Sequence, residues 1–250
     1  MIETKGLSFA YTNSREILDQ ISFTLEAGHF LALLGNNGAG KSTLLKCLNG
    51  ILPTGAGIVF ADGKDLYRMT RRHVAQTMAY VEQTNEATRL TVYDVVLMGR
   101  KPYITVGPTK EDFAIVENAL ERLHLKPYSL RYVDELSGGE LQKVIIARAL
   151  AQCPKIMLLD EPISNLDLHN QHEVMRIAQE LAQKDGITVI VVIHDLNLAL
   201  RYCDRFLVLA DGGIYDYGDD SVITQKMLSE VYHVDAQIVE FLEHKLVVVK

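Results

Sequence analysis

The fold of this chain is decided by Gly35-Asn36-Asn37-Gly38-Ala39-Gly40-Lys41-Ser42-Thr43, which fills every fixed position of the phosphate-binding pattern G-x-x-x-x-G-K-[ST]. Before this stretch, residues 29–34 form a short apolar run of strand length, and residues 42–48 have the pattern of a helix. A strand, a glycine-rich loop and a helix in this order are the context that the pattern requires. We therefore predict a phosphate-binding loop at residues 35–43.

The residue types of this loop predict the chemistry of its ligand. Glycines at 35, 38 and 40 permit a tight turn whose backbone N–H groups point at phosphate oxygens, and the helix N-terminus adds partial positive charge. We expect Lys41 to reach the β- and γ-phosphates, and Ser42 to complete a Mg²⁺ shell that keeps several waters. The implied ligand is a nucleoside triphosphate with Mg²⁺.

Composition indicates a soluble globular protein. The 250 residues carry a net charge of −7 without a clustered basic surface, which argues against a nucleic-acid-binding protein. We interpret the short cluster Arg68, Arg71 and Arg72 as a solvated helix face. Because no apolar run could span a bilayer and the first residues lack a signal-peptide pattern, we expect a cytosolic chain whose membrane role would need a partner.

Three further apolar runs of strand length end in residues that can act on phosphate. They occupy residues 78–81, 155–159 and 187–193. Because the carboxyl ends of parallel strands meet the ligand crevice, Asp160 is expected to hold Mg²⁺ and Glu161 to polarise the attacking water. Gln83 could touch the metal or the water, and His194 could hold the γ-phosphate. Taken singly, a glutamine at a strand end is more often a surface residue and a lone histidine is usually structural.

The other segments predict an alternating α/β chain with an insertion. Strands are expected in residues 7–11, 17–25, 57–63, 237–241 and 246–249, and a hairpin with a glycine turn in residues 206–217. Tyr11 lies near the end of the first strand, where it could stack on a purine base. From about residue 87 to 153 the pattern is helical, and Phe113, Val116, Leu120 and Leu123 share one predicted apolar face. We treat this region as an inserted helical subdomain.

A second candidate anion site lies at Leu136-Ser137-Gly138-Gly139-Glu140, which opens a predicted helix. A serine before two glycines at a helix start offers N–H groups and a hydroxyl to an anion. The spacing of Ser137 and Glu140 equally fits an ordinary capping box, and without the loop upstream the capping box would be preferred.

The order of these motifs resembles the ATPase subunit of ABC transporters, and the resemblance covers the whole chain. It implies an α/β fold of the P-loop NTPase class with a RecA-like core, an antiparallel β-subdomain and the helical insertion, all in one nucleotide-binding domain over residues 1–250. It also implies a homodimer packed head to tail. Each ATP would lie between one subunit's P-loop and the signature residues Ser137, Gly138, Gly139 and Glu140 of the other subunit.

The resemblance also assigns roles residue by residue. Tyr11 matches the adenine-stacking position, and residues 35–43 match the phosphate loop. Gln83 matches the glutamine that links the metal site to the membrane partner, and Asp160 the Mg²⁺ acid. Glu161 matches the general base, Asp167 the aspartate that communicates across the dimer, and His194 the switch histidine. Since every hydrolytic position is filled, the resemblance implies an active ATPase.

Within the family, residues 90–103, including Gly99-Arg100-Lys101-Pro102, resemble the importer branch for iron–siderophore, haem or cobalamin. The resemblance implies integral membrane permease subunits, indirectly a solute-binding protein, and a location at the cytoplasmic face of the membrane. Three residues depart from the usual pattern: Asn36 for proline or serine, Glu82 for proline, and Asn165 for alanine or histidine. Asn36 keeps its backbone N–H, whereas Glu82 could loosen the coupling segment.

Other functions stay open at this point. A soluble ABC ATPase for assembly or repair lacks a transport role, although residues 83–137 leave no room for the long coiled coil of repair ATPases. A nucleotide-regulated scaffold would bind ATP without cleaving it, which the presence of Glu161 and His194 disfavours. An importer of another substrate, such as a free metal ion, is a further alternative.

Overall fold

A six-stranded sheet forms the centre of the structure, a computed structural model that describes residues 1–11, 16–83, 89–242 and 244–250. In spatial order its strands are β10 (Gly213–Gly218), β9 (Arg205–Ala210), β3 (Phe30–Leu34), β8 (Thr188–Val192), β7 (Ile156–Asp160) and β6 (Met78–Val81). All neighbouring pairs are parallel except β10 with β9. Every residue of β3, β7 and β8 is buried, as expected for parallel strands covered on both faces. The predicted apolar strands are therefore confirmed.

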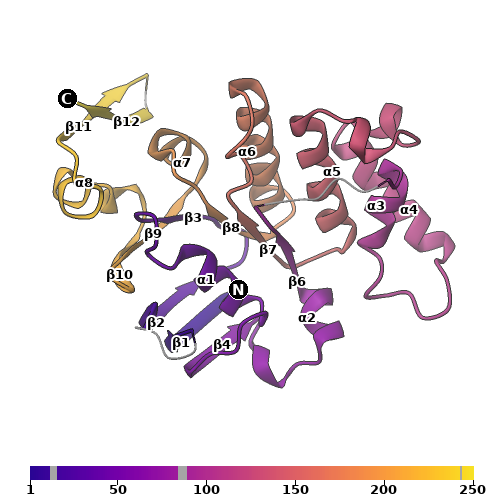
Figure 1. Cartoon of the computed structure of the whole chain (residues 1–250), viewed down its shortest axis with the longest axis horizontal. Coiled ribbons are helices and arrows are strands. Elements are labelled where there is room, and N and C mark those ends of the chain that lie inside the picture. The colour runs from indigo at the N-terminus through magenta and orange to yellow at the C-terminus, as the bar shows by residue number, and fades with distance from the viewer. Residues whose placement is uncertain (12–15, 84–88, 243) are drawn as a thin grey trace.

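An antiparallel sheet packs on one face of the central sheet (Figure 1). Its strands, in spatial order, are β2 (Leu18–Leu25), β1 (Ile2–Phe9), β4 (Ala56–Ala61) and β5 (Lys64–Asp65). The helix α1 (Lys41–Leu48) follows the predicted phosphate loop and shares a buried apolar cluster with both sheets. Leu44, Leu45 and Leu48 are fully buried in this cluster, so the start of α1 is firmly anchored.

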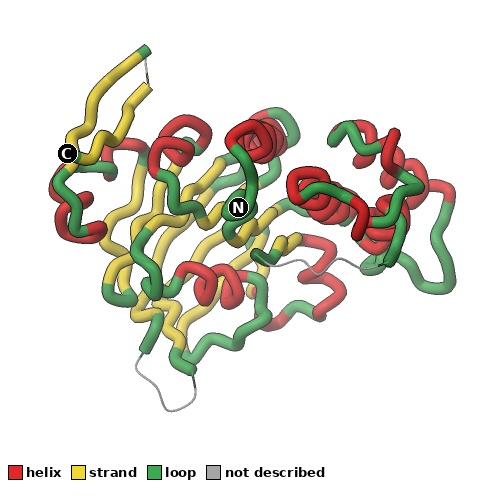
Figure 2. Tube along the Cα trace, turned by 45° about the horizontal axis from the view of Figure 1, so that its top comes forward, coloured by secondary structure: helices red, strands yellow, loops and turns green. Residues whose placement is uncertain are grey.

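Helices cover the opposite face of the central sheet (Figures 1 and 2). The longer helices of the chain are α4 (Lys110–Arg122), α5 (Gly138–Ala151) and α6 (Leu168–Gln183), and the shorter ones are α2 (Arg71–Thr77), α3 (Val92–Met98), α7 (Leu196–Tyr202) and α8 (Gln225–Tyr232). Single 3₁₀ turns occur at Leu66–Arg68, Lys126–Tyr128, Val133–Glu135 and Asp220–Val222. In Figure 1, α3, α4 and α5 lie together at one end of the molecule. No helix in the described part of the chain has both the length and the apolar composition needed to cross a membrane.

The prediction of the apolar face of α4 is wrong at the first turn of this helix. Val116, Leu120 and Leu123 are buried, but Phe113 is 40% exposed. The inward position of that turn belongs to Asp112, whose carboxylate accepts a hydrogen bond from Arg100. A buried ion pair therefore occupies the place where the sequence pattern predicted an aromatic ring.

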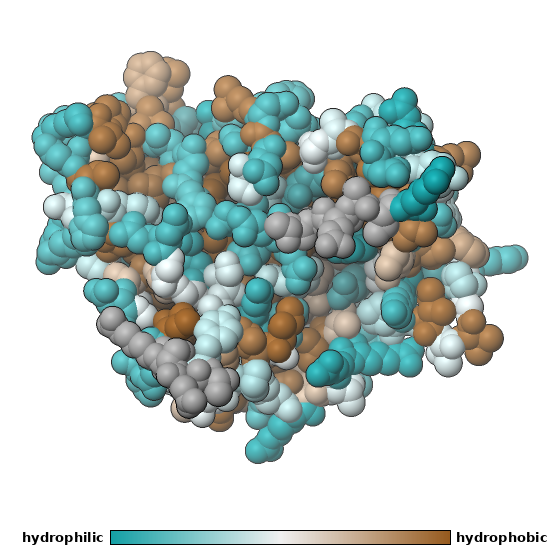
Figure 3. Space-filling model, in the orientation of Figure 1, coloured by the Kyte–Doolittle hydropathy of each residue, from teal (hydrophilic) through white to brown (hydrophobic). Residues whose placement is uncertain are grey.

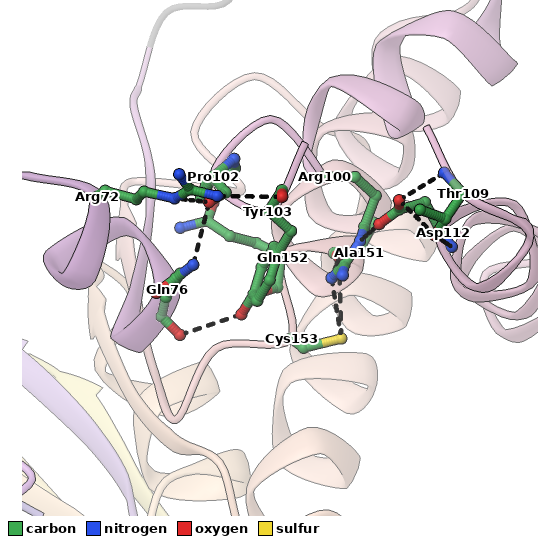
Figure 4. Close-up of polar contacts among 10 residues, drawn as sticks. All are labelled: Arg72, Gln76, Arg100, Pro102, Tyr103, Thr109, Asp112, Ala151, Gln152 and Cys153. Carbon is green, nitrogen blue, oxygen red and sulfur yellow. Dashed lines mark hydrogen bonds and ion pairs between the residues drawn. The ribbon is translucent and has the colours of Figure 1, made fainter. Parts of the chain in front are cut away.

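Arg100 joins three elements of the helical region (Figure 4). Its Nε donates to Asp112 Oδ1 at 2.8 Å, one terminal nitrogen donates to the carbonyl of Ala151 at 2.8 Å, and the Tyr103 ring centre lies 3.9 Å from the guanidinium carbon. Gly99 allows this close approach, because a Cβ there would lie 2.1 Å from the carbonyl oxygen of Arg148 on α5. The Gly-Arg-x-Pro segment therefore connects α3 with α4 and α5 through these contacts.

The same segment is tied to α2 (Figure 4). Arg72 donates to the carbonyls of Pro102 at 2.7 Å and Tyr103 at 3.1 Å, and Gln76 donates to Pro102 at 3.0 Å. Arg72 is exposed on α2, as predicted for a solvated helix face, and it also bonds to these two carbonyls. Arg68 lies before α2 in a 3₁₀ turn and is exposed.

The last part of the chain forms α8 and a hairpin of β11 (Ala236–Phe241) and β12 (His244–Val249). Asn197 of α7 holds this hairpin, since its side chain accepts the N–H of Val247 at 2.8 Å and donates to the carbonyl of Val247 at 3.3 Å. Phe241 and Leu242 at the hairpin tip are 63% and 76% exposed, and apolar surface gathers over this part of the molecule in Figure 3.

Candidate functional site

Four loops converge because four parallel strands end at the same edge of the central sheet. β3 leads into the loop at residues 35–43, β6 leads to Gln83, β7 ends at Asp160 and Glu161, and β8 leads to His194. Hydrogen bonds join the side chains at this edge into two groups, one around Asp160 and one around Glu161. The structure thus brings together residues from positions 35 to 194 of the chain.

The loop at residues 35–43 has the backbone shape that its glycines predict. Gly35 has a φ of 138°, and a Cβ there would lie 2.4 Å from the carbonyl oxygen of Leu209, so only glycine fits. Lys41 is 6% exposed and donates from Nζ to the carbonyls of Gly35 at 2.7 Å and Asn36 at 2.9 Å. Burial lowers the pKa of Lys41, and the nearby Glu161 and Asp160 oppose this shift. The lysine charge is held over the loop.

Asp160 accepts a hydroxyl proton at each carboxylate oxygen. Ser42 of α1 donates to Oδ1 at 2.8 Å, and Tyr80 of β6 donates to Oδ2 at 3.0 Å. Asp160 is 3% exposed, so these bonds are shielded from water. Burial and the Asp160 charge raise the pKa of Tyr80, which keeps its phenol protonated as a donor.

Glu161 lies between Gln83 and His194. The Gln83 amide donates to Oε2 at 2.8 Å, and His194 Nε2 is 2.8 Å from Oε1. The backbone of Glu161 is left-handed, with a φ of 49°, immediately after the last residue of β7. This conformation ends the strand and is uncommon for a residue with a long side chain.

Tyr11 lies beside the helix that follows the loop. Its ring packs edge-on against Phe9, with 4.9 Å between ring centres, and its hydroxyl is 3.5 Å from Oγ1 of Thr43. Tyr11 is 44% exposed. Part of this aromatic residue is therefore accessible to solvent next to the loop.

The Ser137 segment is built as a capping box. The backbone N–H and the hydroxyl of Ser137 donate to Oε2 of Glu140 at 2.9 and 2.7 Å, and these bonds lower the pKa of Glu140. The hydroxyl oxygen of Ser137 accepts the N–H of Glu140 at 3.4 Å. Gly139 lies against α6, since a Cβ there would lie 2.3 Å from the side chain of Asn170.

Asp167 begins α6 beside this segment. Its Oδ1 accepts the backbone N–H of Asn170 at 2.9 Å, which lowers the pKa of Asp167. The Asn170 side chain also donates to both oxygens of Asp167, at 3.0 and 2.9 Å. Ser137, Gly139 and Asp167 therefore lie in one neighbourhood, built from α5 and α6.

Two tyrosines at the site were missed by the sequence analysis. Tyr80 contacts Asp160, and the Tyr232 hydroxyl accepts the N–H of Gly35 at 3.0 Å. Tyr80 lies three residues before Gln83 on a strand already placed at the site, so its side-chain face offered a signal. Tyr232 lies at the end of α8, almost two hundred residues beyond the loop, and its sequence surroundings offered none.

Comparison with known protein families identifies the family of proteins to which this site belongs. A family model described as "ABC transporter" matches residues 18–164, which is more than half of the chain. This chain belongs to the ABC transporter family. The predicted family and its P-loop ATPase chemistry are therefore confirmed, and ATP is the nucleotide that the family binds.

Relatives of this ABC transporter chain match over nearly its whole length. It is 49% identical to an uncharacterized ABC transporter ATP-binding protein of Methanocaldococcus jannaschii, with 95% of this chain and 93% of the relative covered. It is 42% identical to a hemin import ATP-binding protein of Bordetella avium, with 90% and 89% covered. An inward-facing structure of a putative metal-chelate type ABC transporter matches with a TM-score of 0.86 and 31% identity, covering 100% of this chain and 96% of that one. The predicted fold class is confirmed.

Proposed function

We propose that this chain is the ATP-hydrolysing subunit of an ABC importer for a metal chelate of the iron–siderophore, haem or cobalamin type. The observation that carries the proposal is the arrangement of Glu161 between Gln83 and His194, next to the Asp160–Ser42 pair. The relatives' printed functions, hemin import and metal-chelate transport, support the substrate class.

Glu161 is proposed as the general base for the attacking water. Gln83 and His194 each hold one carboxylate oxygen, so Glu161 is fixed in orientation before substrate arrives. His194 would orient the water and hold the γ-phosphate. General-base catalysis of this kind contributes about 10²- to 10⁴-fold to a rate.

The donor set at Asp160 fits Mg²⁺. Ser42, Asp160 and Gln83 offer oxygen ligands, and in the described part of the chain no group of three or more His, Cys, Asp or Glu side chains is placed to hold a metal. Mg²⁺ commonly binds through one or two protein oxygens together with phosphate and water, so a richer protein cage is not needed. When bound, Mg²⁺ would neutralise charge on the phosphates, while Asp160 and Ser42 hold it and Lys41 binds the phosphate oxygens.

ATP is proposed to lie between two copies of the chain. Tyr11 would stack on adenine, and residues 35–43 would bind the phosphates. Ser137, Gly138, Gly139 and Glu140 of the second copy would close the site, with Asp167 communicating between the copies. Support comes from the contacts of Ser137 and Asp167, whose side chains bond to Glu140 and Asn170 and not to the loop at residues 35–43.

The proposed assembly contains one nucleotide-binding domain per chain, over residues 1–250, with the helical subdomain at about 87–153. Two such chains would dock on integral membrane permease subunits at the cytoplasmic face of the membrane. A solute-binding protein would act on the permease from the other side, and no nucleic acid is involved. Closure on ATP and reopening after hydrolysis would be transmitted through the helical subdomain.

The catalytic part is tested with Glu161→Gln in the full chain. We expect ATP hydrolysis to fall by about 10²-fold or more while ATP binding persists. Glu180→Gln is the matched control, because Glu180 lies on α6 in a surface pair with Lys184 and should leave turnover unchanged. Turnover near the wild-type rate in Glu161→Gln would contradict the assignment of the base.

The transport part is tested by capturing the chain from its native membranes. Co-purification of a multi-span permease supports the importer. Recovery of the chain alone from the soluble fraction would favour an assembly factor instead.

A further inference from the structure

The carboxyl end of α8 contacts the first two residues of the phosphate loop. The Tyr232 hydroxyl accepts the N–H of Gly35 at 3.0 Å, and the Asn36 side-chain amide donates to the carbonyl of Val231. Gly35 is buried and Asn36 is half-buried, so both contacts are partly shielded from water. Two independent hydrogen bonds therefore join α8 to the loop.

Each of these bonds satisfies a group that has no partner within its own element. The Val231 carbonyl lies in the last turn of α8, where helix carbonyls have no N–H four residues ahead. The Gly35 N–H lies just past the end of β3, where the strand ladder has stopped. Loss of either partner would leave a buried or half-buried polar group unpaired.

The helix that makes these contacts is itself fixed. Met227, Leu228 and Val231 of α8 are at most 3% exposed within the larger apolar cluster. In Figure 1 this helix lies at the edge of the central sheet formed by β9 and β10. α8 can therefore act as a rigid reference for the loop.

The contacts also affect Lys41, because its Nζ donates to the carbonyls of the same two residues. The orientation of the Gly35 and Asn36 peptide groups sets where these carbonyls point. Any rotation of this turn would move the lysine charge as well as the backbone N–H groups of the loop.

We propose that Tyr232 and Asn36 are positioning residues for ATP binding, through which α8 fixes the first turn of the phosphate loop. Asn36, a departure from the usual family residue, thereby has a specific role. The inference rests on the proposed binding of ATP at residues 35–43.

The test compares two hydroxyl deletions on tyrosines that contact or belong to α8. Tyr232→Phe removes the partner of Gly35, whereas Tyr215→Phe removes a bond to Glu230 of α8, at 2.6 Å, and no hydrogen bond of residues 35–43. Dissociation constants for ATP are measured in EDTA, and KM and kcat are measured with Mg²⁺. We expect Tyr232→Phe to weaken ATP binding by about three- to tenfold, the usual size of one lost hydrogen bond. KM should rise while kcat stays within about twofold of wild type, and Tyr215→Phe should match wild type.

Asn36→Ala is the second variant, because it removes the side-chain contact with the Val231 carbonyl at a half-buried position. It should weaken ATP binding to a similar extent. The double variant should weaken binding by less than the product of the two effects, since both act on one turn. ATP affinity equal to that of Tyr215→Phe in both single variants would overturn the inference. Absence of ATP binding by the wild-type chain would instead overturn the proposed function.

Discussion

Tyr80 and Asp160, on neighbouring parallel strands, are joined by a 3.0 Å hydrogen bond from the tyrosine hydroxyl to the carboxylate. In the register of these strands Tyr80 is opposite Leu158, so its side chain shares a sheet face with Asp160, two residues further on. That face also carries α1 and hence Ser42. Tyr80 therefore holds one oxygen of the carboxylate while the other faces Ser42.

Tyr80→Phe is expected to raise the Mg²⁺ concentration that ATP hydrolysis requires, without weakening the binding of metal-free ATP. The variant frees Oδ2 of Asp160, so the carboxylate can rotate away from Ser42. We expect the Mg²⁺ concentration for half-maximal hydrolysis to rise by about three- to tenfold, the effect of one hydrogen bond. ATP binding in EDTA, measured by calorimetry, should be unchanged.

Tyr67→Phe is the control for this experiment. Its hydroxyl donates to the carbonyls of Cys47 and Leu52, at 3.0 and 3.2 Å, and has no contact with Asp160. If Tyr67→Phe and Tyr80→Phe showed the same Mg²⁺ dependence, the hydroxyl of Tyr80 would have no positioning role.

Removal of Arg100 should destabilise the helical region strongly. Arg100→Ala would leave the Asp112 carboxylate buried without its cation, and both side chains are at most 6% exposed. Breaking such a pair costs about 3 kcal/mol in the free energy of unfolding. Arg122→Ala breaks the pair with Asp185, where each side chain is about one-third exposed, and should cost about 1 kcal/mol or less. Urea unfolding of both variants measures the difference.

The Arg100 effect should depend on pH. Hydrogen bonds from Thr109, together with Arg100, lower the pKa of Asp112 to about 2, against about 4 in an unfolded chain. The stabilisation is therefore fully present above about pH 4 and is lost as the pH falls toward 2. The difference between wild type and Arg100→Ala should shrink over that interval. A difference that stays constant from pH 7 to pH 2 would mean that the charge of Asp112 is not involved.

Ser137→Asn separates the two explanations of the Ser137 segment. Asparagine caps a helix about as well as serine, so a purely structural role predicts unchanged stability and unchanged hydrolysis. If Ser137 contacts the γ-phosphate across the dimer, hydrolysis should fall by about tenfold or more while the melting temperature stays within a few degrees. Thr91→Asn changes the capping residue of α3 in the same way and serves as the control.

The sequence predicted the parts of this fold that depend on local pattern. Apolar runs before Gly35, Gln83, Asp160 and His194 are strands, and because these strands are parallel the four residues lie at one edge. The type of chemistry followed from residue types at strand ends. Neither step required knowledge of a distant contact.

The parts that were missed depend on long-range pairing. Asp112 was not among the residues predicted for the apolar face of its helix, yet it is buried because Arg100, twelve residues earlier, supplies a cation. Tyr232 reaches Gly35 across nearly the whole chain. Helical periodicity describes one element at a time, so it cannot show which polar side chain of one element meets a polar group of another.

At Glu161, the left-handed backbone conformation favours glycine for stability, whereas the proposed activity requires a carboxylate. A glycine would adopt this conformation without strain, whereas a residue with a Cβ loses about 1 kcal/mol there. Only a long carboxylate, however, can reach both Gln83 and His194 from this position. A search for stabilising substitutions would therefore favour glycine at position 161 and would remove the proposed general base, which is the trade-off expected where a fold retains strain for function.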